Sequence, residues 1–123
     1  MKSANNQEVL FIASRSPWSS AAAAAGADLL MTAAVFEQSV GVVFCGDGVW
    51  QLQAGQDGSG LGLKTLAKIF PAFELYDIKR IRVAESSLRE RGLTLQDLVM
   101  DVELVNDEGM RTLIASSKTV FVF

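Results

Sequence analysis

The stretch VGVVFCGDGVWQL, residues 40–52, decides the fold class of this chain. Its first six residues are β-branched, aromatic or small, which predicts a strand at residues 40–45 that is buried on both faces. Gly46-Asp47-Gly48 then predicts a turn, and the following VWQL predicts a short helix. A buried strand that leads through a turn into a helix is typical of a parallel α/β sheet.

The rest of the chain repeats this alternation of strands and helices. Further strands are predicted at Val9–Ala13, at residues 80–84 and at residues 119–123, while residues 99–105 fit a strand or an extended connection. Predicted helices follow caps at Ser19 or Ser20, at Ser87 and at Asn106-Asp107, and a fourth covers residues 64–71. The Ser87 helix starts at a capping box, SLRE, and ends at Gly92. We predict one α/β domain over residues 1–123, with a mostly parallel open sheet and helices on both faces.

Composition excludes several classes of function. The chain has 123 residues, of which 50% are hydrophobic, and a net charge of −3; its mean hydropathy is +0.27. The acidic balance argues against binding nucleic acid directly. Residues 21–36 are too short an apolar run to span a bilayer comfortably, and the N-terminus does not resemble a signal peptide. We therefore expect a cytoplasmic protein that buries apolar surface against partners or beneath helices.

The absence of histidine and the single cysteine limit the chemistry further. No Ser-His or Cys-His pair is possible, and zinc ribbons and CxxC redox motifs are excluded. We predict no metal site and no cofactor. Two glycine-rich stretches imitate nucleotide loops but lack a required glycine: Gln51 replaces one after Gly46-Asp47-Gly48, and Leu63 replaces one in GSGLGLKT, residues 58–65. A flexible loop is the better interpretation of both.

Cys45 has two interpretations. It follows a strand, where open α/β sheets place ligands, and a helix beginning near Gly48 would favour a reactive thiolate. However, Asp47 lies two residues away, and free cysteine is among the most buried residue types. Packing is therefore the favoured role.

Three neighbours of Cys45 also have two interpretations. Asp47, Trp50 and Gln51 would line a pocket or an interface, or else cap the helix and fill the core. A basic cluster, interrupted by acidic residues, is either a partner surface or a solvated face; it consists of Lys79, Arg80, Arg82, Arg89 and Arg91.

Three segments in order, DGVWQLQAGQ (residues 47–56), LYDI (75–78) and SLRERGL (87–93), resemble the TusC/DsrF-type subunits of the DsrE-like sulfur-relay family. The resemblance covers nearly the whole chain. It implies an open α/β sheet and a heterohexamer with two copies each of this chain and of TusB- and TusD-type paralogues. It also implies contacts of that complex with an upstream persulfide carrier and a TusE-type carrier, and sulfur delivery to the 2-thio group of the tRNA wobble uridine.

The resemblance also bears on individual residues. In TusD-type subunits the sulfur-carrying cysteine lies on a later strand. Setting that part of the strand against residues 81–84, IRVA, places Arg82 at the position of the cysteine. The chain would then be a non-catalytic structural subunit. The resemblance then implies a partner interface or a strand-end site that contains Asp47, Trp50, Gln51, Tyr76 and Arg82.

Three alternatives stay open. They are a DsrEFH-type subunit in dissimilatory sulfur oxidation, a sulfane-sulfur acceptor that acts through Cys45, and a self-assembling domain that binds a small ligand.

Overall fold

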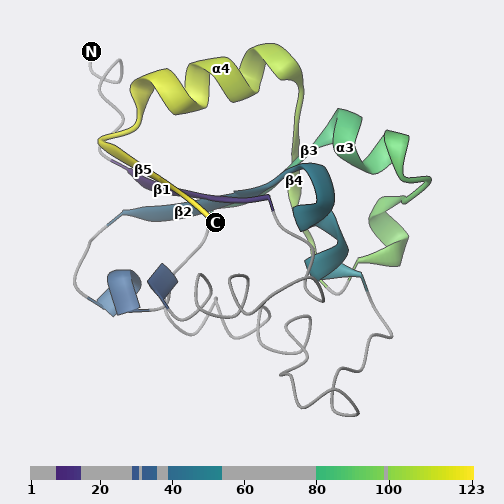
Figure 1. Cartoon of the computed structure of the whole chain (residues 1–123), viewed down its shortest axis with the longest axis horizontal. Coiled ribbons are helices and arrows are strands. Elements are labelled where there is room, and N and C mark those ends of the chain that lie inside the picture. Colours follow the sequence, from purple (N-terminus) through teal and green to yellow (C-terminus); the bar gives the residue numbers. More distant parts are fainter. Residues whose placement is uncertain (1–7, 15–28, 31, 36–38, 54–79, 99) are drawn as a thin grey trace.

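A computed structural model describes residues 8–14, 29–30, 32–35, 39–53, 80–98 and 100–123 of the chain. Five strands form one sheet in the order β4-β3-β2-β1-β5, and every neighbouring pair is parallel (Figure 1). The strands are β1 (Val9–Ala13), β2 (Val40–Phe44), β3 (Arg80–Ala84), β4 (Glu103–Val105) and β5 (Thr119–Val122). The predicted parallel α/β sheet is confirmed.

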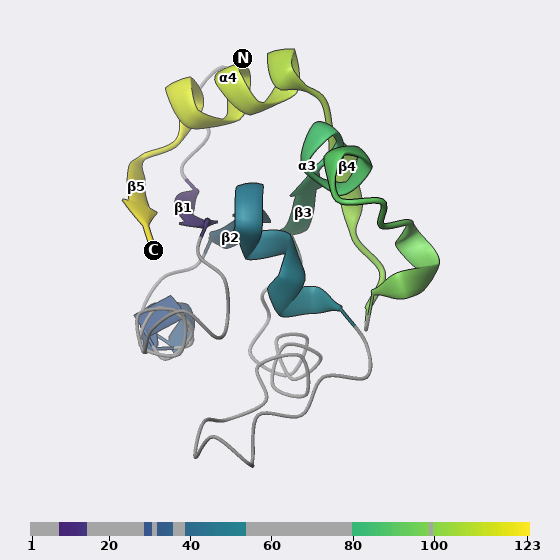
Figure 2. The same ribbon diagram turned by 45° about the vertical axis from the view of Figure 1, so that its right-hand side comes forward.

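Helices cover both faces of the sheet, as the sequence predicted. Helix α4 (Asp107–Ser116) lies over one face, while the helical residues 29–30 and 32–35 and the 3₁₀ helix η2 (Gly46–Leu52) lie over the other (Figures 1 and 2). The larger core cluster lies on the η2 face, around Phe11, Phe44 and Leu52. The smaller cluster lies beneath α4 and contains Leu10, Ile12 and Val43. Alternate residues of the buried strands β1 and β2 therefore fill two separate cores.

The chain order explains this division. Strands β1 to β4 are added in one direction across the sheet, whereas β5 returns to the far side of β1. Because crossovers between parallel strands are right-handed, reversing the direction moves the connecting helix to the opposite face. Helix α4 makes that return, and among the described helices it is the one that packs against the smaller core.

One predicted helix start is wrong. The capping box at Ser87 was expected to open a helix, but α3 spans Glu85–Glu90 and Ala84 is its N-terminal cap residue. The Ser87 hydroxyl accepts a hydrogen bond from the Gly46 N–H at 2.9 Å, and so it joins α3 to the end of β2. Gly92 does follow the end of the helix, with φ 68°, and the Leu93 N–H donates to the Leu88 carbonyl in a Schellman arrangement.

Several predictions lie outside the described residues. They are Tyr76, Lys79, the glycine-rich residues 58–65, the helix at residues 64–71, and the cap at Ser19 or Ser20 with most of the helix that follows it. Within the described ranges, no helix is long and apolar enough to cross a membrane.

Candidate functional site

The carboxyl ends of β2 and β3 bring Cys45, Asp47 and Arg91 together. The Asp47 carboxylate accepts hydrogen bonds from the Arg91 Nε and Nη2 atoms at 3.2 and 3.0 Å, and no side-chain cap bond forms at the start of η2. The Arg91 side chain also donates to the Ser87 carbonyl at 3.1 Å. Asp47 therefore does not cap the helix, and it joins η2 to the end of α3.

Cys45 lies half-buried beside this ion pair and packs against the smaller core cluster. Burial raises the pKa of the Cys45 thiol above its ordinary value, and the nearby Arg91 guanidinium opposes that shift without cancelling it. The N–H groups of Cys45, Gly46 and Gly48 all donate within the protein, to the Ala13 carbonyl, the Ser87 hydroxyl and the Cys45 carbonyl. These three donors are thus already engaged and do not point at a thiolate or at a sulfur bound to it.

Gly48 has a packing role that accounts for the glycine without a nucleotide. A Cβ atom at this position would lie 1.9 Å from the Ala13 carbonyl oxygen. The close approach of η2 to the end of β1 therefore requires glycine.

A second group of charged residues lies on the α4 face of the sheet. The buried Arg82 guanidinium holds the buried Glu8 carboxylate through two hydrogen bonds, Nη1 to Oε2 at 2.9 Å and Nη2 to Oε1 at 3.1 Å. The half-exposed Arg80 side chain adds a third, at 3.1 Å. Two arginines share one carboxylate, so this cluster carries a formal charge of +1.

Gly41 makes this ion pair possible. Glu8 immediately precedes β1 and Arg82 is in β3, so their side chains meet over the intervening strand β2. A Cβ atom at Gly41 would lie 2.2 Å from the Glu8 Oε2 atom. The glycine in VGVVF therefore leaves the space that the carboxylate fills.

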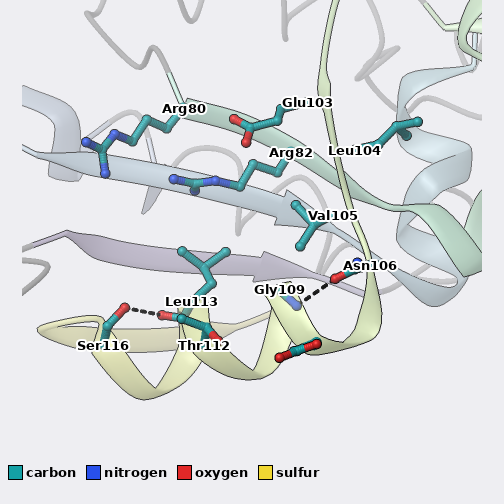
Figure 3. A pocket seen from close by; sticks show the side chains of 11 residues that line it. Arg80, Arg82, Glu103, Leu104, Val105, Asn106, Gly109, Thr112, Leu113 and Ser116 are labelled. Atoms are coloured by element: carbon teal, nitrogen blue, oxygen red, sulfur yellow. Dashed lines mark hydrogen bonds between the residues drawn. The ribbon is translucent and has the colours of Figure 1, made fainter. Parts of the chain in front are cut away.

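An open groove of about 680 Å³ runs between this cluster and α4. Figure 3 shows that the arginines lie along the sheet side and that α4 forms the opposite side. No residue of α4 is fully buried, which is why the groove stays open. Its lining is mixed in charge and polarity: Arg80, Arg82, Glu103, Leu104, Val105, Asn106, Glu108, Gly109, Thr112, Leu113 and Ser116.

The fold and the sequence place the chain among known proteins. The model of the DsrE/DsrF-like family matches residues 7–123. The chain belongs to the DsrE/DsrF-like family. A TusC homolog of Vibrio vulnificus is 35% identical over 116 residues, which is 94% of this chain and 98% of that protein. The intracellular sulfur oxidation protein DsrF of Allochromatium vinosum is 34% identical over 93 residues, 76% of this chain and 68% of DsrF.

A solved structure of the family fold agrees. The crystal structure of the ychN protein from E. coli superposes with a TM-score of 0.81 and covers 96% of this chain and all of that one, at 16% identity. That likeness supports the fold alone. It matches the parallel sheet with helices on both faces that the residue patterns predicted.

The family fold separates the predicted site residues. Cys45 and Asp47 lie at the strand ends, with Trp50 half-buried and Gln51 fully buried in η2. Arg82 instead lies under the groove and shares Glu8 with Arg80, whereas Arg89 pairs with Glu85 and Arg91 with Asp47. Lys79 of the predicted basic cluster lies outside the described residues. Whether any of these residues contacts a partner stays a prediction.

Sequence reasoning missed Glu8. A signal was present, because Glu8, Leu10 and Ile12 alternate along the chain and so share one face of β1. A carboxylate on a buried face of a strand needs a cationic partner. Arg82, in the strand predicted at residues 80–84, was the residue that could supply it.

Proposed function

We propose that this chain is a non-catalytic structural subunit of a TusBCD-type sulfur-relay complex. The similarity to a TusC homolog over 94% of the chain carries the proposal. TusB- and TusD-type paralogues would complete a heterohexamer with two copies of each subunit. The cytoplasmic complex would receive persulfide sulfur from an upstream carrier and pass it to a TusE-type carrier, toward 2-thiolation of the tRNA wobble uridine.

Persulfide transfer requires a thiolate, and this explains why we assign the chain no chemical step. An acceptor thiolate attacks the outer sulfur of a persulfide, a new S–S bond forms, and the donor leaves as a thiolate. In the correspondence with TusD-type subunits that the sequence implied, Arg82 would stand at the sulfur-carrying position. A guanidinium has no nucleophilic atom at neutral pH, and both Nη atoms of Arg82 are bonded to Glu8.

Cys45 is the remaining acceptor and is poorly suited to the step. Its pKa is raised by burial, so less thiolate is present at neutral pH than for an exposed cysteine. The adjacent Arg91 charge, which would favour a thiolate, is already paired with Asp47 at 3.0 Å. These observations support a packing role for the thiol.

A second candidate has the same architecture with a different final product. The 34% identity to the sulfur oxidation protein DsrF favours a DsrEFH-type subunit in dissimilatory sulfur metabolism. The two candidates differ in the fate of the sulfur and not in the chemistry assigned to this chain. The presence of 2-thiouridine in the tRNA of the source cell would favour the first candidate, provided that it depends on this chain. Thiouridine that does not depend on this chain would favour the second.

Sulfur flux through the relay tests the proposed role. We expect that removal of the whole chain abolishes 2-thiouridine in tRNA, because the complex loses a structural subunit, whereas Cys45→Ser leaves it unchanged. Native gels of the Cys45→Ser complex control for assembly. Loss of 2-thiouridine from a fully assembled Cys45→Ser complex would contradict the proposal and make Cys45 a sulfur carrier.

A further inference from the structure

Strand β5 is an edge strand among the strands that the structure describes, where it pairs only with β1. The Phe123 N–H donates to the Ile12 carbonyl at 2.8 Å, toward β1. Because N–H groups alternate in direction along a strand, those of Val120 and Val122 point away from the sheet. This edge therefore presents backbone donors and acceptors in the pattern that a further strand would bind.

The side chains of β5 do nothing to protect the edge. The strand and its flanking Phe123 read TVFVF, without a charge, a proline or a glycine. Phe121 is 44% exposed on one face and Val122 is 66% exposed, the highest exposed fraction among the large hydrophobic side chains of the described residues. Protein edges are normally protected by charge, proline, bulges or a covering segment. An uncharged edge of this kind is typical of a strand that is paired in the assembled protein.

The opposite edge is protected in the usual way. Strand β4 has three residues, one of which is the exposed Glu103, and the exposed Asp101 lies just before it. A second copy that added its β5 to this edge would bury apolar side chains against these carboxylates. That contact would also repeat from copy to copy and build an open fibre. The charges on β4 disfavour both outcomes.

We propose that β5 pairs antiparallel with β5 of a second copy of this chain, about a twofold axis at Phe121. In this register Val120 of one copy lies opposite Val122 of the other, and the outward N–H and C=O groups of both residues form hydrogen bonds. The contact uses the same edge on both copies, so it closes at two. The result is one continuous sheet of ten strands.

The charge beside β5 fits this twofold arrangement. Lys118 immediately precedes the strand, so the two Lys118 side chains lie at opposite ends of the pair. Six residues at about 3.4 Å each separate them by about 20 Å, which is beyond the Debye length of about 8 Å at physiological ionic strength. A parallel pairing would instead place the two cations side by side.

This inference goes beyond the proposed function because it names a surface through which two copies meet. The β5 pairing leaves α4, the groove and the carboxyl ends of the strands around Cys45 available to other subunits. In a complex with two copies of each subunit, the β5 pair would supply a twofold joint. The isolated chain tests the pairing without any paralogue, so its outcome is separable from that of the relay proposal.

Sedimentation equilibrium of the full chain measures the pairing directly. We expect a monomer–dimer equilibrium that Val122→Lys weakens roughly tenfold or more, because two cations then enter the paired edge. Leu104→Lys is the matched control, since Leu104 is an exposed aliphatic residue on the other edge strand. This variant should leave the dimer constant unchanged.

Hydrogen exchange of the unaltered chain provides a readout that needs no variant. The amides of Val120 and Val122 should become more protected as the protein concentration rises, while the β4 amides do not change. A chain that stays monomeric at high micromolar concentration would overturn the inference. So would a dimer weakened by Leu104→Lys and not by Val122→Lys, or protection of β5 that appears only when a paralogue is added.

Discussion

At the residue scale, Glu8 and Arg82 form an ion pair in which both side chains are buried. Both charges lie in the interior, where an ion costs several kcal/mol unless it is paired and hydrogen-bonded. The bidentate geometry and the space over Gly41 meet that condition. The proposed correspondence with TusD-type subunits would put Arg82 where those subunits carry a cysteine, and under that proposal the pair has a structural role.

Removal of one partner should therefore be costly. Arg82→Gln leaves the Glu8 carboxylate buried without its bidentate partner, and we expect a loss of about 3–5 kcal/mol in the free energy of unfolding. Arg80 contacts the same carboxylate, but its side chain is 57% exposed, so Arg80→Gln should cost about 1 kcal/mol or less. Urea unfolding followed by circular dichroism measures both. Equal losses for the two variants would show that the buried ion pair contributes no more to the free energy of unfolding than the exposed one.

The Cys45 thiol should react slowly near neutral pH. Burial raises its pKa in the folded chain, so the reactive thiolate should form only as the pH rises beyond the range of an exposed cysteine. The folded state then holds this proton more tightly than the unfolded state, and stability should fall as the pH rises through that interval. Iodoacetamide labelling over a pH series, with the urea-unfolded chain as control, measures the shift. Labelling that is as fast at pH 7 in the folded chain as in the unfolded one would contradict the assignment.

At the element scale, strands were predicted better than helix boundaries. Runs such as VLFIA and VGVVF are apolar on both faces, as a covered parallel sheet requires, so the strand type follows from the sequence. The limits follow less well, because β4 has three residues where residues 99–105 fitted a strand or an extended connection. Helix α3 was misplaced because its cap signal at Ser87 is used elsewhere: the hydroxyl serves a tertiary contact to Gly46. Tertiary contacts of this kind leave no local pattern. For the same reason the groove under α4 could not be predicted, since it depends on how far the helix stands from the sheet.

No residue of helix α4 is fully buried, so the stability of this helix should depend on its N-terminal cap. The Asn106 Oδ1 atom accepts from the Gly109 N–H at 2.8 Å, as the sequence predicted for this start. Asn106→Ala should destabilise the chain by about 1 kcal/mol, while Asn106→Asp, an equivalent cap, should keep the stability. Hydrogen exchange of the α4 amides should report the loss first, because no α4 residue is fully buried. Equal exchange in the two variants would show that the cap does not hold the helix.

At the scale of the whole molecule, the composition and the architecture agree. A hydrophobic fraction of 50% is high for a chain of this size, and the sheet with helices on both faces uses much of it. The remaining apolar surface includes β5 and several exposed side chains, which suits a subunit better than an isolated monomer. The two charged groups lie at separate places, one at the strand ends and one beneath the groove, and neither offers an activated nucleophile.

The native mass of the chain after co-expression with TusB- and TusD-type subunits tests the central claim most directly. We predict one species whose mass equals two copies of each of the three subunits. The same measurement on Val122→Lys should still show all three subunits together, because the substitution affects only the edge between copies. A homo-oligomer of this chain that excludes both paralogues would contradict the relay assignment and return attention to the thiol of Cys45.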